Sequence, residues 1–353
     1  MRILHASHQQ YKYLGARNYL FPVRINNGFV RNQHEVYWYS DRDVARASSW
    51  FHTRSTGVGA ANKKFIQACL NFQPDLIALS NADILTPDTL RTIRQRLPNV
   101  AIFQYFIDTL AIERNLKNVQ TKKDVVDKTF VTTAGTTLAR LAGRHSRVAF
   151  VPNPVDPSID VYRCHERDDL PTDIFFAGHI GSDWQHRDDL RGKAHDLITR
   201  HFPDTTCAFH SQNAQGYLYG ADFMRAVGNA KIGLNFSQRH RDTTPGPGGD
   251  LYLYSSDRIG IYQGNGLLLF CTREFNLSEL YGNDTLVEID GEADFIDKLR
   301  HYLDHDDDRK RVARSGYELG HAEFNERLVS QYMVESTLGL PFSHPYVWPT
   351  TSY

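Results

Sequence analysis

Long hydrophobic runs are missing from this sequence. No apolar stretch approaches the roughly 20 residues that a membrane-spanning helix needs, and the opening residues Met1 to His5 are too short and polar for a signal peptide. Net charge is small as well, because 40 Lys and Arg residues face 41 Asp and Glu residues. No overall field therefore draws the chain onto nucleic acid or an anionic membrane. We expect a soluble cytoplasmic protein.

Cysteine is scarce, and several well-known motifs are absent. The four cysteines are scattered with no CxxC pair, which indicates reduced structural thiols and argues against a disulfide framework or a zinc site. The histidines form no metal-ligand pattern on one helix face. The sequence contains no P-loop, GxSxG elbow or complete GxGxxG, so the NTPase, hydrolase and usual dinucleotide-binding classes are excluded.

What the sequence does contain is a repeated alternation of strand and helix patterns over a length that suits two domains. Such alternation predicts parallel sheets with helices on both faces. Strands are expected over residues 2–6, 35–39, 76–80, 101–106, 129–133 and 148–151, and then over 173–178, 206–210, 230–236, 266–270 and 285–289. Helices are expected over residues 23–31, 63–71, 87–97, 188–201, 222–227, 257–262, 292–303, 306–321 and 325–338.

A proline-rich segment over residues 152–157 divides the two series, because proline prevents regular strand pairing and fixes an extended path. We predict an α/β protein with two doubly wound, Rossmann-like domains and a ligand cleft between the carboxyl ends of their sheets. The predicted boundaries are an N-terminal domain over 1–155, a linker over 156–171, a C-terminal domain over 172–324, and a helix and tail over 325–353 that pack on the first domain.

Two glycine-punctuated segments of the second half are candidates for holding phosphate. Gly178 and His179 directly follow a predicted strand, where backbone N–H groups and the start of a helix favour an anion, and Arg187 follows in the same loop. An ordinary tight turn explains this segment equally well. The second segment places Tyr254, Ser255, Ser256 and Arg258 at a helix start, then a strand, then a second helix start. Two helix starts and an arginine can converge on one diphosphate. An ordinary βα unit with a surface ion pair is the alternative for this segment.

The second segment also resembles a known family. Arg258 and Gly266, the strand that follows, residues 277–282 and the pattern from Leu286 to Leu303 are similar to the C-terminal domain of CgeB-like, group 1-type glycosyltransferases of the GT-B fold. The resemblance continues through Arg309 and Gly316, and more weakly through residues 74–77 and 152–156 of the first half. It implies a donor site for a nucleotide sugar in the second domain. The donor-binding residues are then Gly178, His179, Arg187, Tyr254, Ser255, Ser256, Arg258, Asn276, Leu277, Ser278 and Glu279.

One position departs from the family pattern. Family members typically carry Glu three residues after the arginine that matches Arg258, whereas this chain has Ile261. Many retaining GT-B enzymes use that carboxylate on the ribose or the sugar of the donor. A different donor, such as a CMP-linked acidic sugar, is therefore an open alternative.

Carboxylates at the strand ends of the first half are the catalytic candidates. Asp83 and Asp108 each follow a predicted strand of that domain closely. A carboxylate can activate the acceptor hydroxyl in an inverting reaction or stabilise charge in a retaining one. Capping or loop hydrogen bonding is the alternative role. His8, Lys12 and Arg17, in the first loop, are the acceptor-side candidates, with surface solvation as their alternative role.

The predicted function is glycosyl transfer from a nucleotide sugar to a glycan or other hydroxyl acceptor, which the resemblance links to bacterial cell-surface polysaccharide assembly. No metal and no cofactor are expected, since GT-B enzymes as a class usually work without a bound metal and the nucleotide sugar is a substrate. Peripheral membrane association is compatible with this function. The Gly/Pro patch over residues 243–249 is either a lid over the donor or an insertion. A GT-B-like nucleotide-sugar epimerase and a non-catalytic two-domain binding protein are the alternatives.

Overall fold

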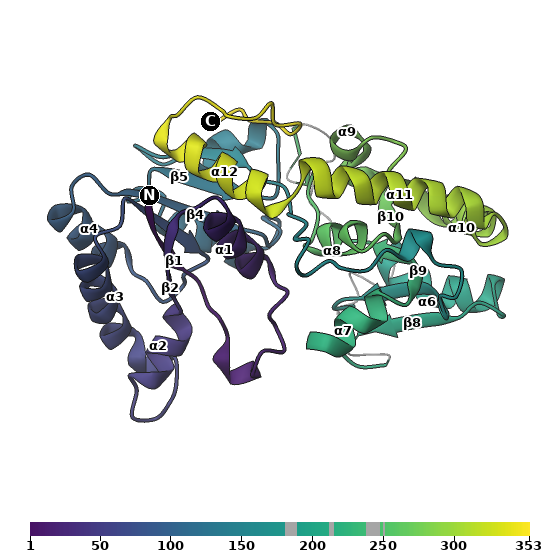
Figure 1. The fold of residues 1–353 in the computed structure, drawn as a ribbon, viewed down its shortest axis with the longest axis horizontal. Helices are drawn as coiled ribbons and strands as arrows, with labels where there is room; N and C mark the ends of the chain where they lie inside the picture. Colours follow the sequence, from purple (N-terminus) through teal and green to yellow (C-terminus); the bar gives the residue numbers. More distant parts are fainter. Residues whose placement is uncertain (181–188, 212–214, 238–247, 250) are drawn as a thin grey trace. The chain divides into compact units, whose positions relative to one another are not determined.

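In the computed structural model the chain forms two compact units, and the structure describes residues 1–180, 189–211, 215–237, 248–249 and 251–353. Unit 1 consists of Met1–Pro154 together with Glu326–Tyr353, and unit 2 of Val155–Asn325. Each unit is a parallel sheet with helices on both faces (Figure 1). The predicted pair of Rossmann-like α/β sheets is therefore confirmed.

The sheet of unit 1 has the strand order β2-β1-β3-β4-β5-β6, and every pairing is parallel. Its strands are β1 (Arg2–Ala6), β2 (Glu35–Tyr39), β3 (Leu76–Ser80), β4 (Ala101–Phe106), β5 (Lys128–Val131) and β6 (Arg147–Phe150). Its helices are α1 (Phe21–Arg31), α2 (Asp41–Ala47), α3 (Val58–Phe72), α4 (Pro87–Arg96), α5 (Glu113–Thr121) and α12 (Glu326–Leu338).

Side chains alternate across the strands of unit 1, as the pleat requires. Leu4 and Ala6 of β1 join the hydrophobic cluster under α3 and α4, whereas His5 points to the opposite face and packs edge-on against Phe29 of α1. The start of α4 follows the expected pattern, because the side chain of Thr86 accepts a hydrogen bond from the backbone N–H of Thr89 and Pro87 occupies the first turn.

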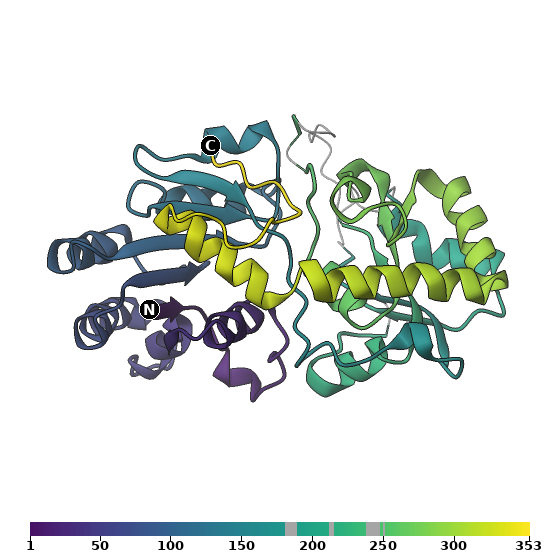
Figure 2. The ribbon, with the colours of Figure 1, turned by 45° about the horizontal axis from the view of Figure 1, so that its top comes forward.

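The C-terminal helix α12 belongs to unit 1 and packs along α1, as Figure 2 shows. The two helices approach so closely that a Cβ at Gly28 would overlap the backbone carbonyl of Glu326. The buried Glu326 carboxylate accepts a hydrogen bond from Arg31 of α1. The tail then adds a backbone pairing beside β6, where Val148 and Tyr353 exchange hydrogen bonds of 2.9 Å.

The sheet of unit 2 has the order β11-β10-β9-β7-β8 and is also parallel throughout. Its strands are β7 (Thr172–Ala177), β8 (Cys207–His210), β9 (Ala230–Asn235), β10 (Leu268–Thr272) and β11 (Val287–Ile289). Its helices are α6 (Leu190–His201), α7 (Gly220–Val227), α8 (Arg258–Gly264), α9 (Ser278–Tyr281), α10 (Gly291–Asp304) and α11 (Asp306–Glu323). Short 3-10 turns lie at 11–13, 55–57, 136–141, 164–166 and 273–275.

The segment predicted as a linker, residues 156–171, packs on unit 2. The Asn265 side chain donates a hydrogen bond to Asp160 (3.0 Å), and the backbone N–H of Cys164 donates to the Asn265 carbonyl (3.0 Å). The ends of unit 2 also meet each other. The N–H of Val155 donates to the carbonyl of Phe324 (2.8 Å), and Val155 forms an isolated β-bridge with Asn325.

Candidate functional site

A cavity of about 380 Å³ lies at the carboxyl edge of the sheet in unit 1. Loops that follow β1, β3 and β4 form it together with the start of α1, helix α2 and the loop after α2. This edge is where doubly wound sheets bind ligands. The lining residues are His8, Gln10, Lys12, Tyr13, Arg17, Leu20, Pro22, Arg42, Arg46, Arg54, Ser80, Asn81, Ile107 and Asp108.

Two of the cationic side chains in this cavity share one carboxylate. Asp83 Oδ1 accepts from Arg42 Nε at 2.8 Å, and Asp83 Oδ2 accepts from Arg54 Nη1 at 3.2 Å. Asn81 and Ala82, which adopt left-handed backbone conformations, turn the chain after β3 toward this pair. Burial of Asp83 opposes its ionisation, but the hydrogen bond and charges of Arg42 and Arg54 outweigh that effect and hold its pKa below the usual range.

The two predicted catalytic carboxylates therefore sit in different places. Asp108 lines the cavity, whereas Asp83 is not among the lining residues and both of its oxygens are bound to arginines. A carboxylate with a lowered pKa and two ion pairs is a poor proton acceptor but a good anchor. The geometry thus gives Asp108 the place of a possible base and Asp83 the place of a positioning residue.

The predicted acceptor-side residues His8, Lys12 and Arg17 all line the same cavity. Burial, followed by the charge of Arg42, lowers the pKa of His8 to about 4, so the imidazole is neutral at pH 7. Its Nδ1 atom is buried and has no hydrogen-bond partner among the described residues. Lys12 and Arg17 both lie over the ring of Tyr13, at 4.5 and 4.1 Å from its centroid.

In unit 2, two buried arginines hold the carboxyl ends of the strands. Arg258 donates from Nη1 to the carbonyl of Ala177 (3.0 Å) and from Nη2 to the carbonyl of Phe236 (3.1 Å), and its Nε lies 3.3 Å from Asn235 Oδ1. Arg191, in the first turn of α6, donates to the same Phe236 carbonyl at 3.0 Å. Arg258 thus ties the ends of β7 and β9 together.

Arg191 remains charged near neutral pH, although burial and the neighbouring Arg258 lower its pKa to about 9. Its Nε has no hydrogen-bond partner among the described residues. Gly178 lies directly against both guanidinium groups, and a Cβ at this position would overlap Arg258 Nη1. Any side chain at position 178 would therefore have to displace the guanidinium of Arg258 from its present place.

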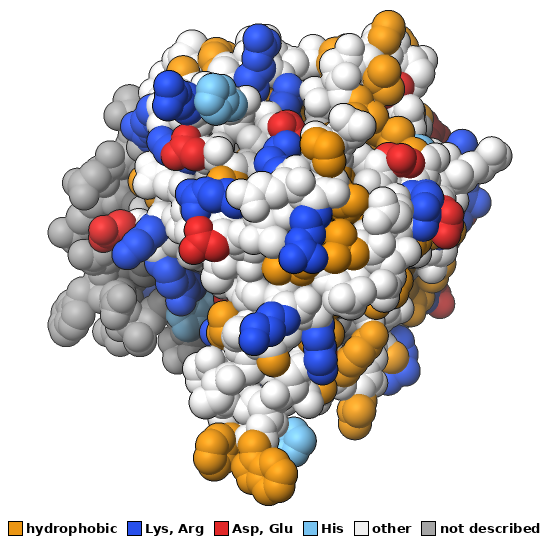
Figure 3. Space-filling model, turned by 90° about the vertical axis from the view of Figure 1, so that its left-hand side faces the viewer, with side chains coloured by type: hydrophobic (Ala, Val, Ile, Leu, Met, Phe, Trp, Pro, Cys, Tyr) orange, Lys and Arg blue, Asp and Glu red, His pale blue; other side chains and the backbone are white. Residues whose placement is uncertain are grey.

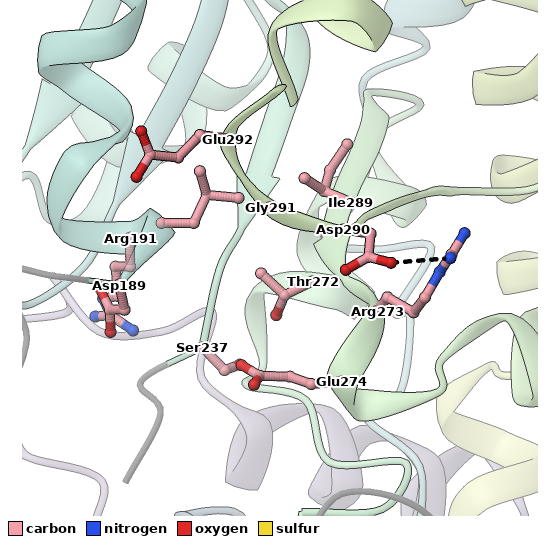
Figure 4. A pocket seen from close by; sticks show the side chains of 11 residues that line it. Asp189, Arg191, Ser237, Thr272, Arg273, Glu274, Ile289, Asp290, Gly291 and Glu292 are labelled. Atoms are coloured by element: carbon pink, nitrogen blue, oxygen red, sulfur yellow. Dashed lines mark hydrogen bonds and ion pairs between the residues drawn. The ribbon is translucent and has the colours of Figure 1, made fainter. Parts of the chain in front are cut away.

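A second cavity of about 420 Å³ opens beside Arg191, at the ends of β9, β10 and β11 (Figure 4). Most of its lining residues have polar side chains, and Arg273 pairs with Asp290 across 3.2 Å. The carboxylates can accept hydrogen bonds from sugar hydroxyls, and the hydroxyls of Ser237 and Thr272 can both donate to them and accept from them. The lining residues are Asp189, Leu190, Arg191, Ser237, Thr272, Arg273, Glu274, Ile289, Asp290, Gly291 and Glu292.

The other predicted donor residues take part in separate hydrogen bonds and contacts. Ser256 Oγ donates to Asn235 Oδ1 (3.0 Å), the atom that Arg258 also contacts. Asn276 donates to Glu279 (3.0 Å), and Glu279 also accepts from the Tyr252 hydroxyl (2.5 Å). The Ser278 N–H donates to Glu288 (2.9 Å), and Leu277 and Ser255 are buried. Tyr254 packs on the ring of Phe275, and His179 Nδ1 lies 2.9 Å from the Tyr217 hydroxyl.

The structure thus brings Gly178, Ser256 and Arg258 together with Asn235, and the acceptor-side residues together with Asp108. Arg187 and most of the predicted lid over 243–249 lie outside the described residues. Sequence reasoning missed three arginines of the unit 1 cavity, Arg42, Arg46 and Arg54, and it missed Arg191. The spacing of Arg42 and Arg46 on one helix face directly after a strand is a signal that could have found them.

The described residues lack a metal-binding cluster and a membrane-spanning helix. They contain no group of three or more His, Cys, Asp or Glu side chains arranged to hold a metal ion. Within the same part of the chain, no helix combines the length and the apolar character needed to cross a membrane.

Comparisons with known proteins agree with this geometry. Residues 176–334, which run from β7 into α12, match the family model described as glycosyl transferase-like. No curated protein matches the sequence. Similar solved structures include sucrose-phosphate synthase from Thermosynechococcus elongatus (11% identity, TM-score 0.57, covering 95% of this chain and 98% of that one). They also include AviGT4, a glycosyltransferase of avilamycin A biosynthesis (14% identity, TM-score 0.59, covering 96% and 98%). The Anabaena protein HepE was solved with UDP (13% identity, TM-score 0.52, covering 96% and 100%).

Proposed function

We propose that this chain, a glycosyltransferase of the GT-B fold, transfers a sugar from a nucleotide-sugar donor to a hydroxyl group of a glycan or another acceptor. The observation that carries the proposal is the glycosyl transferase-like match over residues 176–334, joined to a full-length likeness in fold to glycosyltransferases. Membership of the CgeB-like group and a role in bacterial cell-surface polysaccharide assembly belong to the same proposal.

We assign the donor to unit 2. The buried charges of Arg191 and Arg258 at the strand ends suit the phosphates of a sugar nucleotide, and Asp290 and Glu292, which line the same cavity as Arg191, suit sugar or ribose hydroxyls. HepE was solved with UDP, which supports a nucleotide as the ligand of this unit. Ile261 is buried within α8, so this position offers no carboxylate to the donor, and a donor other than the family's commonest one belongs to the proposal as an alternative.

We assign the acceptor to the cavity of unit 1. In an inverting reaction Asp108 would take the proton of the acceptor hydroxyl as that oxygen attacks the anomeric carbon, and in a retaining reaction a carboxylate would stabilise the developing positive charge. His8, neutral at pH 7, supplies a further hydrogen-bonding group. No metal or cofactor enters this scheme.

The test is a thermal-shift screen against UDP, GDP, CMP, dTDP and ADP and their sugars. A ligand at 100 times its Kd stabilises the folded state by about 2.7 kcal/mol, so a true donor raises the melting temperature clearly. We expect the donor-induced shift to disappear in Arg191→Gln. It should persist in the control Arg300→Gln, which removes a largely exposed arginine of α10.

Product analysis then separates the alternatives. A glycosyltransferase releases free nucleotide and forms a new glycoside only when acceptor is present. An epimerase changes the donor with no acceptor, and a binding protein changes nothing. Either of these last two outcomes would refute glycosyl transfer as the function.

A further inference from the structure

The cavity of unit 1 carries an excess of positive charge. Five cationic side chains line it, namely Lys12, Arg17, Arg42, Arg46 and Arg54. A sixth cation, Lys122, and four carboxylates are associated with them: Asp108 in the lining, Asp83 behind Arg42 and Arg54, Asp43 bound to Arg46 at 2.9 Å, and Asp41, whose charge interacts with those of Arg42 and Lys122. An excess of two positive charges therefore remains in and around a space of about 380 Å³.

The arginine donors are only partly used. Asp83 engages the Nε of Arg42 and one Nη of Arg54, and the other guanidinium nitrogens of these two residues have no hydrogen bond within the described residues. Side-chain exposure is 23% for Arg42 and 47% for Arg54, so both remain open to a ligand. Guanidinium groups held in place by a carboxylate form strong paired hydrogen bonds to phosphate oxygens.

Neighbouring groups suit the same ligand. His8 lines the same cavity, and the buried Nδ1 of its imidazole has no hydrogen-bond partner in the described chain. Lys12, over the ring of Tyr13, adds a compact positive charge. A neutral sugar hydroxyl gives no compensation for so many like charges brought together, whereas a dianion does.

We infer that the cavity of unit 1 binds a phosphate monoester, so that the acceptor of this enzyme is a phosphorylated molecule. That the bound molecule is the acceptor rests on the proposed function. That it carries a phosphate rests on the unit 1 cavity alone. Its chemistry fits two sources, a soluble sugar phosphate and a lipid whose polar end is a phosphate.

The loops that carry the cations bear on the source. Trp50 and Phe51, between α2 and Arg54, are 91% and 73% exposed, and Leu14, between Lys12 and Arg17, is 94% exposed. The loop after α2 lies lowest in Figure 1, and hydrophobic side chains protrude at the lower edge of Figure 3 with Lys and Arg side chains above them. Aromatic side chains beside basic ones are typical of segments that rest on a lipid interface, which favours the lipid source.

The first arm of the test measures binding of glucose 6-phosphate, inorganic phosphate and glucose to the full chain by calorimetry, without donor. We expect both phosphates to bind and glucose to bind at least tenfold more weakly. The variants Arg54→Gln and Lys12→Gln should weaken phosphate binding about tenfold each. The control Arg91→Gln, an exposed arginine of α4 paired with Asp88, should leave it unchanged.

The second arm measures sedimentation with phosphatidylcholine vesicles that contain or lack a polyprenyl phosphate. Binding that requires the polyprenyl phosphate and is lost in a Trp50→Ser, Phe51→Ser double variant identifies the lipid source. Binding in the first arm alone identifies a soluble acceptor. If no phosphate binds in either arm, or if Arg54→Gln and Lys12→Gln bind phosphate as well as the wild type, the inference is wrong.

These outcomes are independent of the proposed function. Transfer to a neutral acceptor by a protein that does not bind phosphate would refute the phosphorylated acceptor and leave glycosyl transfer intact. Phosphate binding by a protein that uses no nucleotide sugar would refute glycosyl transfer and leave the phosphate site of unit 1 intact.

Discussion

Asp83 and Asp108 follow adjacent strands of unit 1, yet their surroundings differ. Asp83 is held between Arg42 and Arg54, while Asp108 lines the cavity. A base must reach the proton that it abstracts, and its pKa must allow it to hold that proton during the reaction. At the scale of single residues, the two carboxylates should therefore contribute to different kinetic constants.

We expect Asp108→Asn to lower kcat by at least about 100-fold, since general base catalysis contributes 10²- to 10⁴-fold. Asp83→Asn should act chiefly on the KM of the acceptor, because it leaves Arg42 and Arg54 without their anchor. Steady-state kinetics with both substrates varied measures each effect. Should both variants retain the wild-type kcat and acceptor KM, the assignment of these carboxylates would be wrong.

Some site residues could be predicted from the sequence and others could not. His8, Lys12, Arg17 and Asp108 are close to predicted strand ends, and the structure places them in one cavity. The role of Arg258 could be predicted only in part. Its position at a helix start is readable, but its three acceptors come from residues 177, 235 and 236, and single-sequence patterns carry no information on such distant pairings.

At the scale of elements, the expected strands all occur, with ends displaced by at most two residues. Buried parallel strands are easy to recognise because nearly every residue is apolar, as in β3. Helices α2 and α5 were not predicted. The first has seven residues and follows β2 after a single residue, and the second buries only Asn115 and Val119. Neither is long enough to show a clear helical period.

The α1–α12 contact gives a prediction at this scale. Gly28→Ala should destabilise unit 1 by roughly 2–3 kcal/mol, because the new Cβ meets the backbone of Glu326, which cannot rotate away as a side chain could. Hydrogen exchange of residues 326–338 in the variant should report detachment of α12. Gly59→Ala is the control. A Cβ there meets nothing within 4 Å, so this change in α3 should be neutral or stabilise the protein by about 0.5 kcal/mol. Equal melting temperatures for Gly28→Ala and the wild type would contradict the close contact.

At the scale of the whole molecule, buried titratable groups of unit 1 set how stability depends on pH. Burial lowers the pKa of both His5 and His8 from 6.5 to about 4. Between these two pH values the unfolded chain binds protons at both histidines, whereas the folded chain does not. Stability is lost there. Asp41 has the opposite effect, because burial raises its pKa from 3.8 to about 6 and the folded state binds the extra proton.

His5 and His8 opposed by Asp41 leave a net effect of one proton between pH 6 and 4, and His34 and His165, whose pKa values burial also lowers, add to the loss. We expect the free energy of unfolding to fall by at least about 1.4 kcal/mol per pH unit in this range. Urea unfolding at several pH values measures this slope. Asp41→Asn should steepen it, since the opposing group is gone. A slope of zero, or one of opposite sign, would show that the histidines are not buried as neutral groups.

The backbone pairing of Val155 with Phe324 and Asn325 has a consequence for evolution and engineering. Unit 2 is one continuous stretch, residues 155–325, whose beginning and end are already hydrogen-bonded neighbours. The stretch can therefore be exchanged as a single segment. A gene could exchange it for the corresponding stretch of another enzyme through two cuts, and the graft would have to restore only one pair of adjacent junctions. With the donor in unit 2 and the acceptor in unit 1, as proposed above, recombination could join a new donor specificity to an existing acceptor domain without gradual substitution.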